Sequence, residues 1–303
     1  MKTLKEYAAI VEKRFEELLP KMAEGEYQIG GMPWLLSDSM RYSLLAGGKR
    51  LRPSMLLACT EMLGGKIEDA LDFACAVEMI HTYSLIHDDL PGMDNDIMRR
   101  GRPTNHVVFG EGQAILAGDG LLNFAFETML RAGMAHPERA ANYLAAISEV
   151  AAGSGVTGMI AGQVMDLHCE HQNAMDEQAL AYIQRNKTAC MFIYPLRAAG
   201  RICGASEEQM QWLDSYGRAF GLLFQATDDL LDVTGDAQKM GKTLGKDAAS
   251  GKLTCISAYG IEGTKKLVDE LYSQALDAMG EFQPNEGADF FFDLVQNMVE
   301  RTN

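Results

Sequence analysis

The stretch DFACAVEMIHTYSLIHDDLPGMD, residues 72–94, decides how the chain is expected to fold. Its apolar residues recur at helical spacing as far as Asp88 and Asp89, and Pro91-Gly92 then ends the helix. A second stretch, AFGLLFQATDDLLD at residues 219–232, has the same character and also ends in aspartates. The sequence therefore predicts two long, mostly apolar helices that each carry acids at the carboxyl end.

These two acidic clusters predict a metal site. Carboxylates that lose their hydration repel one another, so apolar helices are expected to carry them chiefly when a strong cation lies between them. Oxygen ligands without sulfur suit magnesium, which binds through a few carboxylates together with substrate phosphates. For either cluster alone a helix end with solvated acids is the plain alternative, although the helix dipole opposes acids there. The pair of clusters favours a cavity that holds a diphosphate through metal ions.

Helical spacing continues along nearly the whole chain, whereas the alternation typical of strands joined by hairpin turns is essentially missing. We therefore expect an all-α protein, a single domain over residues 1–303 that forms a large bundle of about ten helices. The expected helices span residues 4–19, 35–45, 53–63, 67–89, 112–132, 138–153, 175–200, 207–234, 253–279 and 288–301.

Composition excludes several classes of protein. With 27 basic and 42 acidic residues the net charge is −15, which disfavours nucleic acid or an anionic membrane surface as a partner. Charges in the first turns argue against a secretory signal, and no 18-residue apolar run predicts a membrane span, so a cytoplasmic location is expected. The six cysteines form no CxxC pair and are expected to be buried thiols. His168 and His171 are expected to lie in an ordinary helix or helix end rather than at a metal.

Local geometry can bring the acids together. Pro91-Gly92 breaks the chain so that Asp94 can fold back toward Asp88, which shares a helix face with His81 and Ser84. On the second helix, Asp228 and Asp232 are stacked one turn apart.

Basic residues gather beside these acids and beside glycines. The segments are GGKRLRP at 47–53, RRGR at 99–102, Lys187-Thr188 within an apolar helix, and Lys242, Lys246 and Lys252 after the second cluster. Any one of them alone would be read as solvated surface. In a chain this acidic, their position favours phosphate binding, because glycine-rich helix starts and fixed cations suit phosphate oxygens.

Five segments in this order resemble the short-chain trans-polyprenyl diphosphate synthases, and in particular the bacterial-type farnesyl diphosphate synthases. They are GGKRLRP (47–53), HTYSLIHDDLPGMDNDIMRRGRPTNH (81–106), GQVMDL (162–167), RNKTA (185–189) and FQATDDLLDVTGD (224–236). The resemblance covers nearly the whole chain. It implies a bundle of the isoprenoid synthase type, usually a homodimer, that condenses isopentenyl diphosphate with dimethylallyl or geranyl diphosphate to give farnesyl diphosphate.

The resemblance also implies a role for individual residues. The magnesium ions, three in number with manganese as an alternative, would be held by Asp88, Asp94 and Asp228, with Asp89, Asp229 and Asp232 supporting them directly or through water. The allylic diphosphate would contact Arg99, Lys187 and Lys242. Isopentenyl diphosphate would contact Lys49, Arg52, His81 and Arg100. Thr188 and Gln225 would lie along the reacting carbons.

Product length is predicted from Tyr83 and Ser84. Tyr83 lies five residues before Asp88, about 7.5 Å deeper along the helix. In the resembling family a bulky aromatic residue there limits the product to fifteen carbons, although a tyrosine on a buried helix is often plain core. Farnesyl diphosphate is therefore preferred, with a geranylgeranyl or longer polyprenyl diphosphate as the alternative.

Two further alternatives have other chemistry. A terpene cyclase would carry an asparagine, serine and glutamate metal motif where this chain has DDLLD, and would lack the Lys49 and Arg52 site. A non-catalytic subunit that binds prenyl diphosphates would usually lose one aspartate cluster, and both clusters are present.

Overall fold

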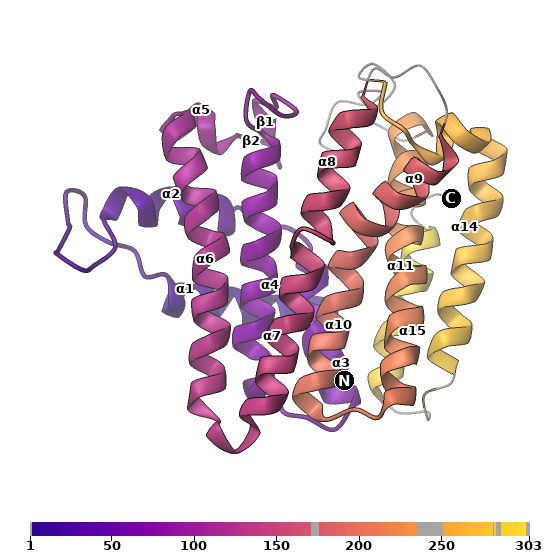
Figure 1. The fold of residues 1–303 in the computed structure, drawn as a ribbon, viewed down its shortest axis with the longest axis horizontal. Coiled ribbons are helices and arrows are strands. Elements are labelled where there is room, and N and C mark those ends of the chain that lie inside the picture. Colours follow the sequence, from indigo (N-terminus) through magenta and orange to yellow (C-terminus); the bar gives the residue numbers. More distant parts are fainter. Residues whose placement is uncertain (1, 171–175, 235–250, 281, 283–285, 301–303) are drawn as a thin grey trace.

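The computed structural model describes residues 2–170, 176–234, 251–280, 282 and 286–300. Within them the chain forms an all-α bundle (Figure 1), which confirms the predicted fold class. The helices are α1 (Leu4–Leu18), α2 (Trp34–Leu44), α3 (Leu51–Met62), α4 (Ile67–Asp88), α5 (Asn105–Phe109), α6 (Glu111–Ala135), α7 (Ala140–Ser154), α8 (Met159–Cys169), α9 (Glu177–Ile183), α10 (Cys190–Cys203), α11 (Glu207–Thr234), α14 (Cys255–Gly280) and α15 (Glu286–Glu300). A 3₁₀ turn, η1 (Pro137–Arg139), precedes α7, and a π-helical turn, η2 (Gln184–Ala189), joins α9 to α10.

The centre of the bundle is built from α4, α10 and α11. Every residue of α4 from Phe73 to Ile80 is buried, as expected of a helix that is apolar around its circumference. Helix α4 packs against α3 and α6, while α10 packs against α3, α7 and α11, and α14 covers α11. The acidic ends of α4 and α11 are therefore carried by the most enclosed helices of the molecule.

The structure differs from the expected helices in three places. The single helix expected over 175–200 is α9, η2 and α10 in succession. Helix α8 has no counterpart among the expected ranges, since the helix expected over 138–153 was followed by none until residue 175. The sequence also gave no warning of the two-residue strands β1 (Met98–Arg99) and β2 (Arg102–Pro103).

The strand pair depends on its turn. Arg100 and Gly101 both adopt positive φ, 52° and 72°, as a two-residue hairpin turn of type I′ requires. Such short strands leave no alternation to detect in the sequence, but the turn directs Arg99 and Arg100 back toward α4.

Other expectations about side chains hold. All six cysteines are free thiols, and five of them are buried. His168 lies near the end of α8, whereas His171 falls outside the described residues. One helical stretch in the described part, Pro137–Cys169, is long and apolar enough to cross a membrane by length and composition, which core helices of soluble proteins also satisfy.

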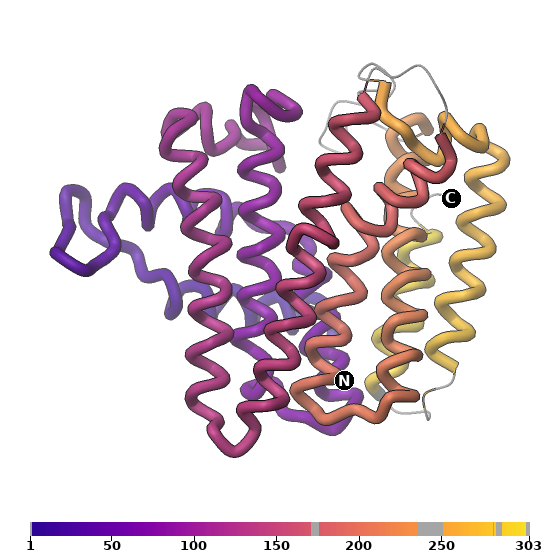
Figure 2. Tube along the Cα trace, in the orientation of Figure 1, coloured from indigo at the N-terminus to yellow at the C-terminus, as the bar shows by residue number. Residues whose placement is uncertain are grey.

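The two acidic clusters meet at one end of the bundle. Helices α4 and α11 run in the same direction, and the trace in Figure 2 shows their carboxyl ends at the same end of the molecule. This arrangement is the geometric condition for a shared cavity.

Candidate active site

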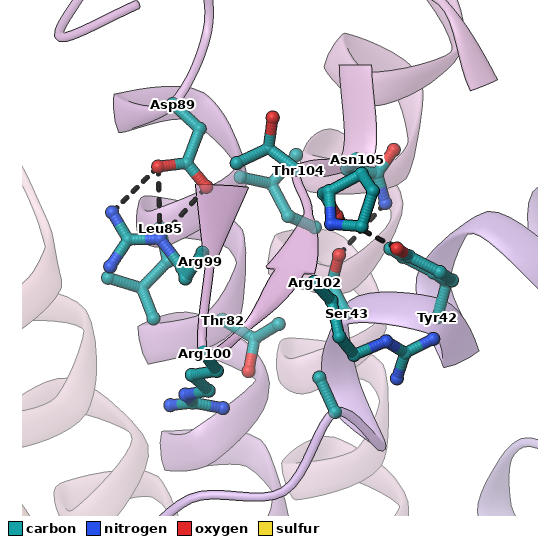
Figure 3. A pocket seen from close by; sticks show the side chains of 13 residues that line it. Tyr42, Ser43, Thr82, Leu85, Asp89, Arg99, Arg100, Arg102, Thr104 and Asn105 are labelled. Atoms are coloured by element: carbon teal, nitrogen blue, oxygen red, sulfur yellow. Dashed lines mark hydrogen bonds and ion pairs between the residues drawn. The ribbon is translucent and has the colours of Figure 1, made fainter. Parts of the chain in front are cut away.

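The first cluster lies where α4 ends. The Asp94 N–H donates to the Asp88 carbonyl oxygen at 2.8 Å, so the chain folds back at Pro91-Gly92 as predicted. Asp89 is only 3% exposed and accepts two-pronged hydrogen bonds from Arg99 on β1, with Nη2 to Oδ1 at 2.7 Å and Nε to Oδ2 at 2.9 Å (Figure 3). Asp89 therefore fastens the hairpin to α4, and Arg99 is engaged with a carboxylate in this state.

The second cluster lies in the last turns of α11. Asp229 is 3% exposed, and its Oδ1 accepts from Gln225 Nε2 at 2.8 Å. Its Oδ2 accepts from the backbone N–H of Cys255, the first residue of α14, at 2.7 Å. Asp228 is half-buried, and Asp232, one turn further on, is buried.

Lys187 and Thr188 reach the site from the π-helical turn η2. An inserted residue of this kind breaks the α-helical register and is frequent at functional sites. Thr188 Oγ1 donates to Gln225 Oε1 at 2.8 Å, which links η2 to α11. Lys187 Nζ contacts Asp166 Oδ2 of α8 at 2.6 Å.

Helix α8 approaches η2 at a glycine. A side chain at Gly162 would place its Cβ 2.2 Å from the backbone nitrogen of Lys187, so glycine is required there. The same GQVMDL segment supplies Asp166, which is 6% exposed. The sequence analysis assigned no role to Asp166, although an acid among apolar residues at helical spacing could have indicated a functional residue.

Lys252 connects the first cluster to the end of α8. Its Nζ lies 3.0 Å from Asp94 Oδ1 and 3.7 Å from Glu170 Oε1. The sequence placed Lys252 among the cations that follow the second cluster but assigned it no contact. Lys242, which was given one, lies outside the described residues.

These groups line one cavity of about 100 Å³ between α8, η2, α11 and the segment before α14. Its walls carry Asp166, Lys187, Thr188, Gln225, Asp229 and Lys252. Asp88 belongs to the same environment. Burial raises the pKa of Asp88 to about 6, an effect that Lys187, Arg99 and Lys252 oppose and that the neighbouring Asp94 strengthens. Acids from α4 and cations from η2 and residue 252 are therefore electrostatically coupled.

A second group of cations lies beside this cavity. Arg52 Nη1 is 3.4 Å from His81 Nε2, and its guanidinium lies over the Phe192 ring at 4.5 Å. Arg100 Nη1 donates to the carbonyl oxygen of Gly47, so the hairpin closes on the glycine loop. Burial and the neighbouring arginines, Arg52 first, hold the pKa of His81 well below its usual range, so this imidazole is neutral. Burial lowers the pKa of Arg52, an effect that the charges of Glu78 and Asp228 oppose.

Lys49 and Arg50, which follow Gly47-Gly48 in the loop before α3, differ in exposure. Lys49 is exposed, whereas the Arg50 side chain is enclosed and pairs with the buried Glu78 at 2.8 Å. Arg50 also takes positive φ, 50°, at the start of α3. Arg50 is therefore a structural residue, whereas Lys49 is exposed at the surface of the loop.

Tyr83 lies on α4 below the acids. It is 6% exposed, and its hydroxyl has no hydrogen-bond partner in the part of the chain that the structure describes. Its ring meets the His87 ring edge-on at 5.7 Å, and burial raises the pKa of its hydroxyl to about 12. Ser84 Oγ donates to the His81 carbonyl oxygen at 2.9 Å. Tyr83 is thus bulky and buried, as expected of a residue that limits product length.

Comparison with known proteins agrees with this geometry. The polyprenyl synthetase family model matches residues 33–284. The chain is 44% identical over 260 residues to geranylgeranyl pyrophosphate synthase 9, chloroplastic, of Arabidopsis thaliana, covering 84% of this chain and 71% of that protein. The chloroplastic geranylgeranyl pyrophosphate synthase of Catharanthus roseus is also 44% identical, over 256 residues, with the same coverage of both chains.

Solved structures carry the same fold. The crystal structure of an FPP/GFPP synthase from Zymomonas mobilis superposes with a TM-score of 0.82 at 31% identity, covering 98% of this chain and 97% of that one. The predicted isoprenoid synthase bundle is therefore confirmed. By sequence and by fold, the chain belongs to the polyprenyl synthetase family and is a short-chain prenyltransferase.

Proposed function

We propose that this prenyltransferase joins isopentenyl diphosphate to an allylic diphosphate by ionising the allylic C–O bond. The observation that carries the proposal is the cavity between α8, η2 and α11, which has Asp229 in its wall. Its two lysines also act on the acids of α4, because the charges of Lys187 and Lys252 oppose the rise in the pKa of Asp88 and Lys252 pairs with Asp94. Such an arrangement suits a multiply charged leaving group that must be neutralised from several sides.

The acids fit magnesium. Asp88 has its pKa raised to about 6, so its negative charge is poorly compensated by the protein alone. No three His, Cys, Asp or Glu side chains among the described residues gather closely enough to hold an ion by themselves. Both features suit ions that take a few carboxylates and complete their shell with water and diphosphate oxygens. Asp88, Asp94 and Asp228 would hold them, and when bound they would stabilise charge on the leaving diphosphate.

The side chains around the cavity divide the remaining work. Lys187 contacts the departing diphosphate, while the Thr188 and Gln225 oxygens point along the reacting carbons and steady the cation with their dipoles. Arg52, Arg100 and Lys49 hold isopentenyl diphosphate, and the neutral His81 adds a hydrogen bond rather than a charge. The double bond of isopentenyl diphosphate then attacks the allylic cation, and the proton that is lost goes to the released diphosphate.

A different observation favours each of two products. The names of the plant relatives favour geranylgeranyl diphosphate, the alternative to the product preferred from sequence, and we propose this product first. The buried ring of Tyr83, one and a half turns below Asp88, favours farnesyl diphosphate as the second candidate.

We also infer that the protein is a homodimer. Apolar side chains are exposed together along α5 to α8, among them Val107, Leu116, Leu144 and Val164, each at least 50% exposed. A second copy covering them would remove that surface from water. A cytoplasmic location remains a prediction from sequence.

The test is a product analysis. Purified protein is incubated with labelled isopentenyl diphosphate and either dimethylallyl or geranyl diphosphate, with magnesium or with a chelator. We expect magnesium-dependent, acid-labile prenyl diphosphates that give a C20 alcohol after phosphatase treatment, and C15 alcohol would favour the second candidate. Hydrocarbon formed without isopentenyl diphosphate would indicate a cyclase, and binding without turnover would indicate a non-catalytic subunit.

A further inference from the structure

Both carboxylate oxygens of Asp229, the second aspartate of the α11 cluster, accept hydrogen bonds from N–H groups. Oδ1 accepts from the Gln225 side chain at 2.8 Å, and Oδ2 accepts from the Cys255 N–H at 2.7 Å. The residue is 3% exposed. A carboxylate whose two oxygens are both held by N–H donors is fixed in direction.

The Cys255 N–H is a donor that α14 itself leaves unmatched. At the start of this helix Thr254 and Ser257 form a reciprocal cap, in which Thr254 Oγ1 accepts from the Ser257 N–H at 3.1 Å and Ser257 Oγ accepts from the Thr254 N–H at 2.9 Å. The N–H of the first helical residue lies outside that exchange. Asp229 accepts it and thereby gains a backbone anchor.

The orientation of Gln225 follows from Asp229. An amide can present either oxygen or nitrogen to a neighbour, and an ionised carboxylate accepts only hydrogen bonds. Asp229 therefore fixes the Gln225 nitrogen on its own side and directs Oε1 to Thr188, which donates to it at 2.8 Å. With its proton committed to Gln225, the Thr188 oxygen presents lone pairs elsewhere.

We propose that Asp229 is a positioning residue, held by the Cys255 N–H, that sets the amide of Gln225 and through it the hydroxyl of Thr188, rather than a ligand of the metal ions. The inference rests on the proposed function, because it gives these two dipoles the task of steadying the allylic cation. It assigns different tasks to the adjacent residues Asp228 and Asp229.

The first test compares Asp229→Asn with Asp228→Asn. Asparagine has one acceptor oxygen, so either Gln225 or Cys255 loses its partner. We expect kcat of Asp229→Asn to fall about 10- to 100-fold, with KM for both substrates within about twofold. Binding of Mn²⁺ together with inorganic diphosphate, followed by electron paramagnetic resonance, should match the wild type for Asp229→Asn and be lost for Asp228→Asn. Equal loss of Mn²⁺ binding in both variants would overturn the proposal.

A double-mutant cycle tests the route through Gln225. If Asp229 acts through the amide, Asp229→Asn combined with Gln225→Ala should be no slower than Gln225→Ala alone, whereas independent roles would multiply the two losses. Multiplied losses would contradict the proposal. Wild-type turnover in Asp228→Asn would instead refute the proposed function, so the two failures are distinguishable.

A backbone variant keeps the test independent of the Asp229 side chain. Proline is accepted at the first position of a helix and lacks the N–H. Turnover of Cys255→Pro should be about tenfold below that of Cys255→Ala, the matched control that keeps the N–H but also loses the Sγ contact with Gln184. Equal turnover of the two variants, with matching circular dichroism spectra, would overturn the proposal.

Discussion

The carboxyl ends of α4 and α11 carry the same pair of adjacent aspartates but secure them in different ways. In both, the first aspartate, Asp88 or Asp228, is half-buried, and the second, Asp89 or Asp229, is 3% exposed. Asp89 holds a charged partner, Arg99, whereas Asp229 holds a neutral amide and a backbone N–H. In each pair the second aspartate thus secures the surrounding structure, and the first is the one proposed to hold metal ions.

The largest effect should come from the first aspartate of each pair. Asp88→Asn and Asp228→Asn each remove a carboxylate proposed to hold magnesium, and we expect turnover to fall about a thousandfold with an unchanged helical spectrum. Asp277→Asn, the same exchange at an exposed site on α14, is the matched control. Wild-type turnover in Asp88→Asn or in Asp228→Asn would contradict the proposal that the first aspartates of the two helices have the same role.

The second aspartates should differ in their effect on stability. Asp89→Asn leaves the Arg99 guanidinium without its carboxylate, whereas Asp229→Asn leaves neutral donors. We expect the free energy of unfolding to fall by about 2–3 kcal/mol for Asp89→Asn and about 1 kcal/mol for Asp229→Asn. Urea denaturation measures both, and the reverse order would contradict the distinction between charged and neutral partners.

The pH dependence of turnover and of stability should report on Asp88. Burial raises the pKa of Asp88 to about 6, and magnesium requires the ionised form, so turnover should rise with pH through about 6. The folded state holds this proton more tightly than the unfolded chain does, so Asp88 makes the metal-free protein less stable as the pH rises from about 4 to about 6. Asp88→Asn should remove that contribution, which thermal unfolding without metal can measure. An unchanged pH dependence of unfolding in this variant would contradict the raised pKa.

The smallest effect on rate, but a clear one on product, is expected below the α4 cluster. Tyr83→Ala removes the buried ring five residues before Asp88, and products should become longer than those of the wild type, with turnover within about threefold. Tyr83→Phe keeps the ring and removes a hydroxyl that has no hydrogen-bond partner among the residues that the structure describes, so this control should keep the wild-type product. An unchanged product chromatogram for Tyr83→Ala would contradict the proposal that Tyr83 limits product length.

Sequence alone predicts most of the contacts at the carboxyl end of α4 and fewer of those at the carboxyl end of α11. The return of Asp94 toward Asp88 follows from Pro91-Gly92, a local signal. No spacing rule relates Asp166 to Lys187, because their contact depends on how α8 crosses η2 at Gly162. The backbone partner of Asp229 was equally hidden, since the chain reaches Cys255, at the start of α14, only after a long connection from α11. Contacts within one turn were predictable, and contacts made by helix crossing were not.

The central claim is that both acidic ends act on one diphosphate through divalent ions. Calorimetric titration of the wild type, Asp88→Asn and Asp228→Asn with inorganic diphosphate, with and without magnesium, tests it most directly. We expect the wild type to bind inorganic diphosphate only with magnesium, and each variant to lose this binding. Tight binding without magnesium, or wild-type affinity in either variant, would contradict it.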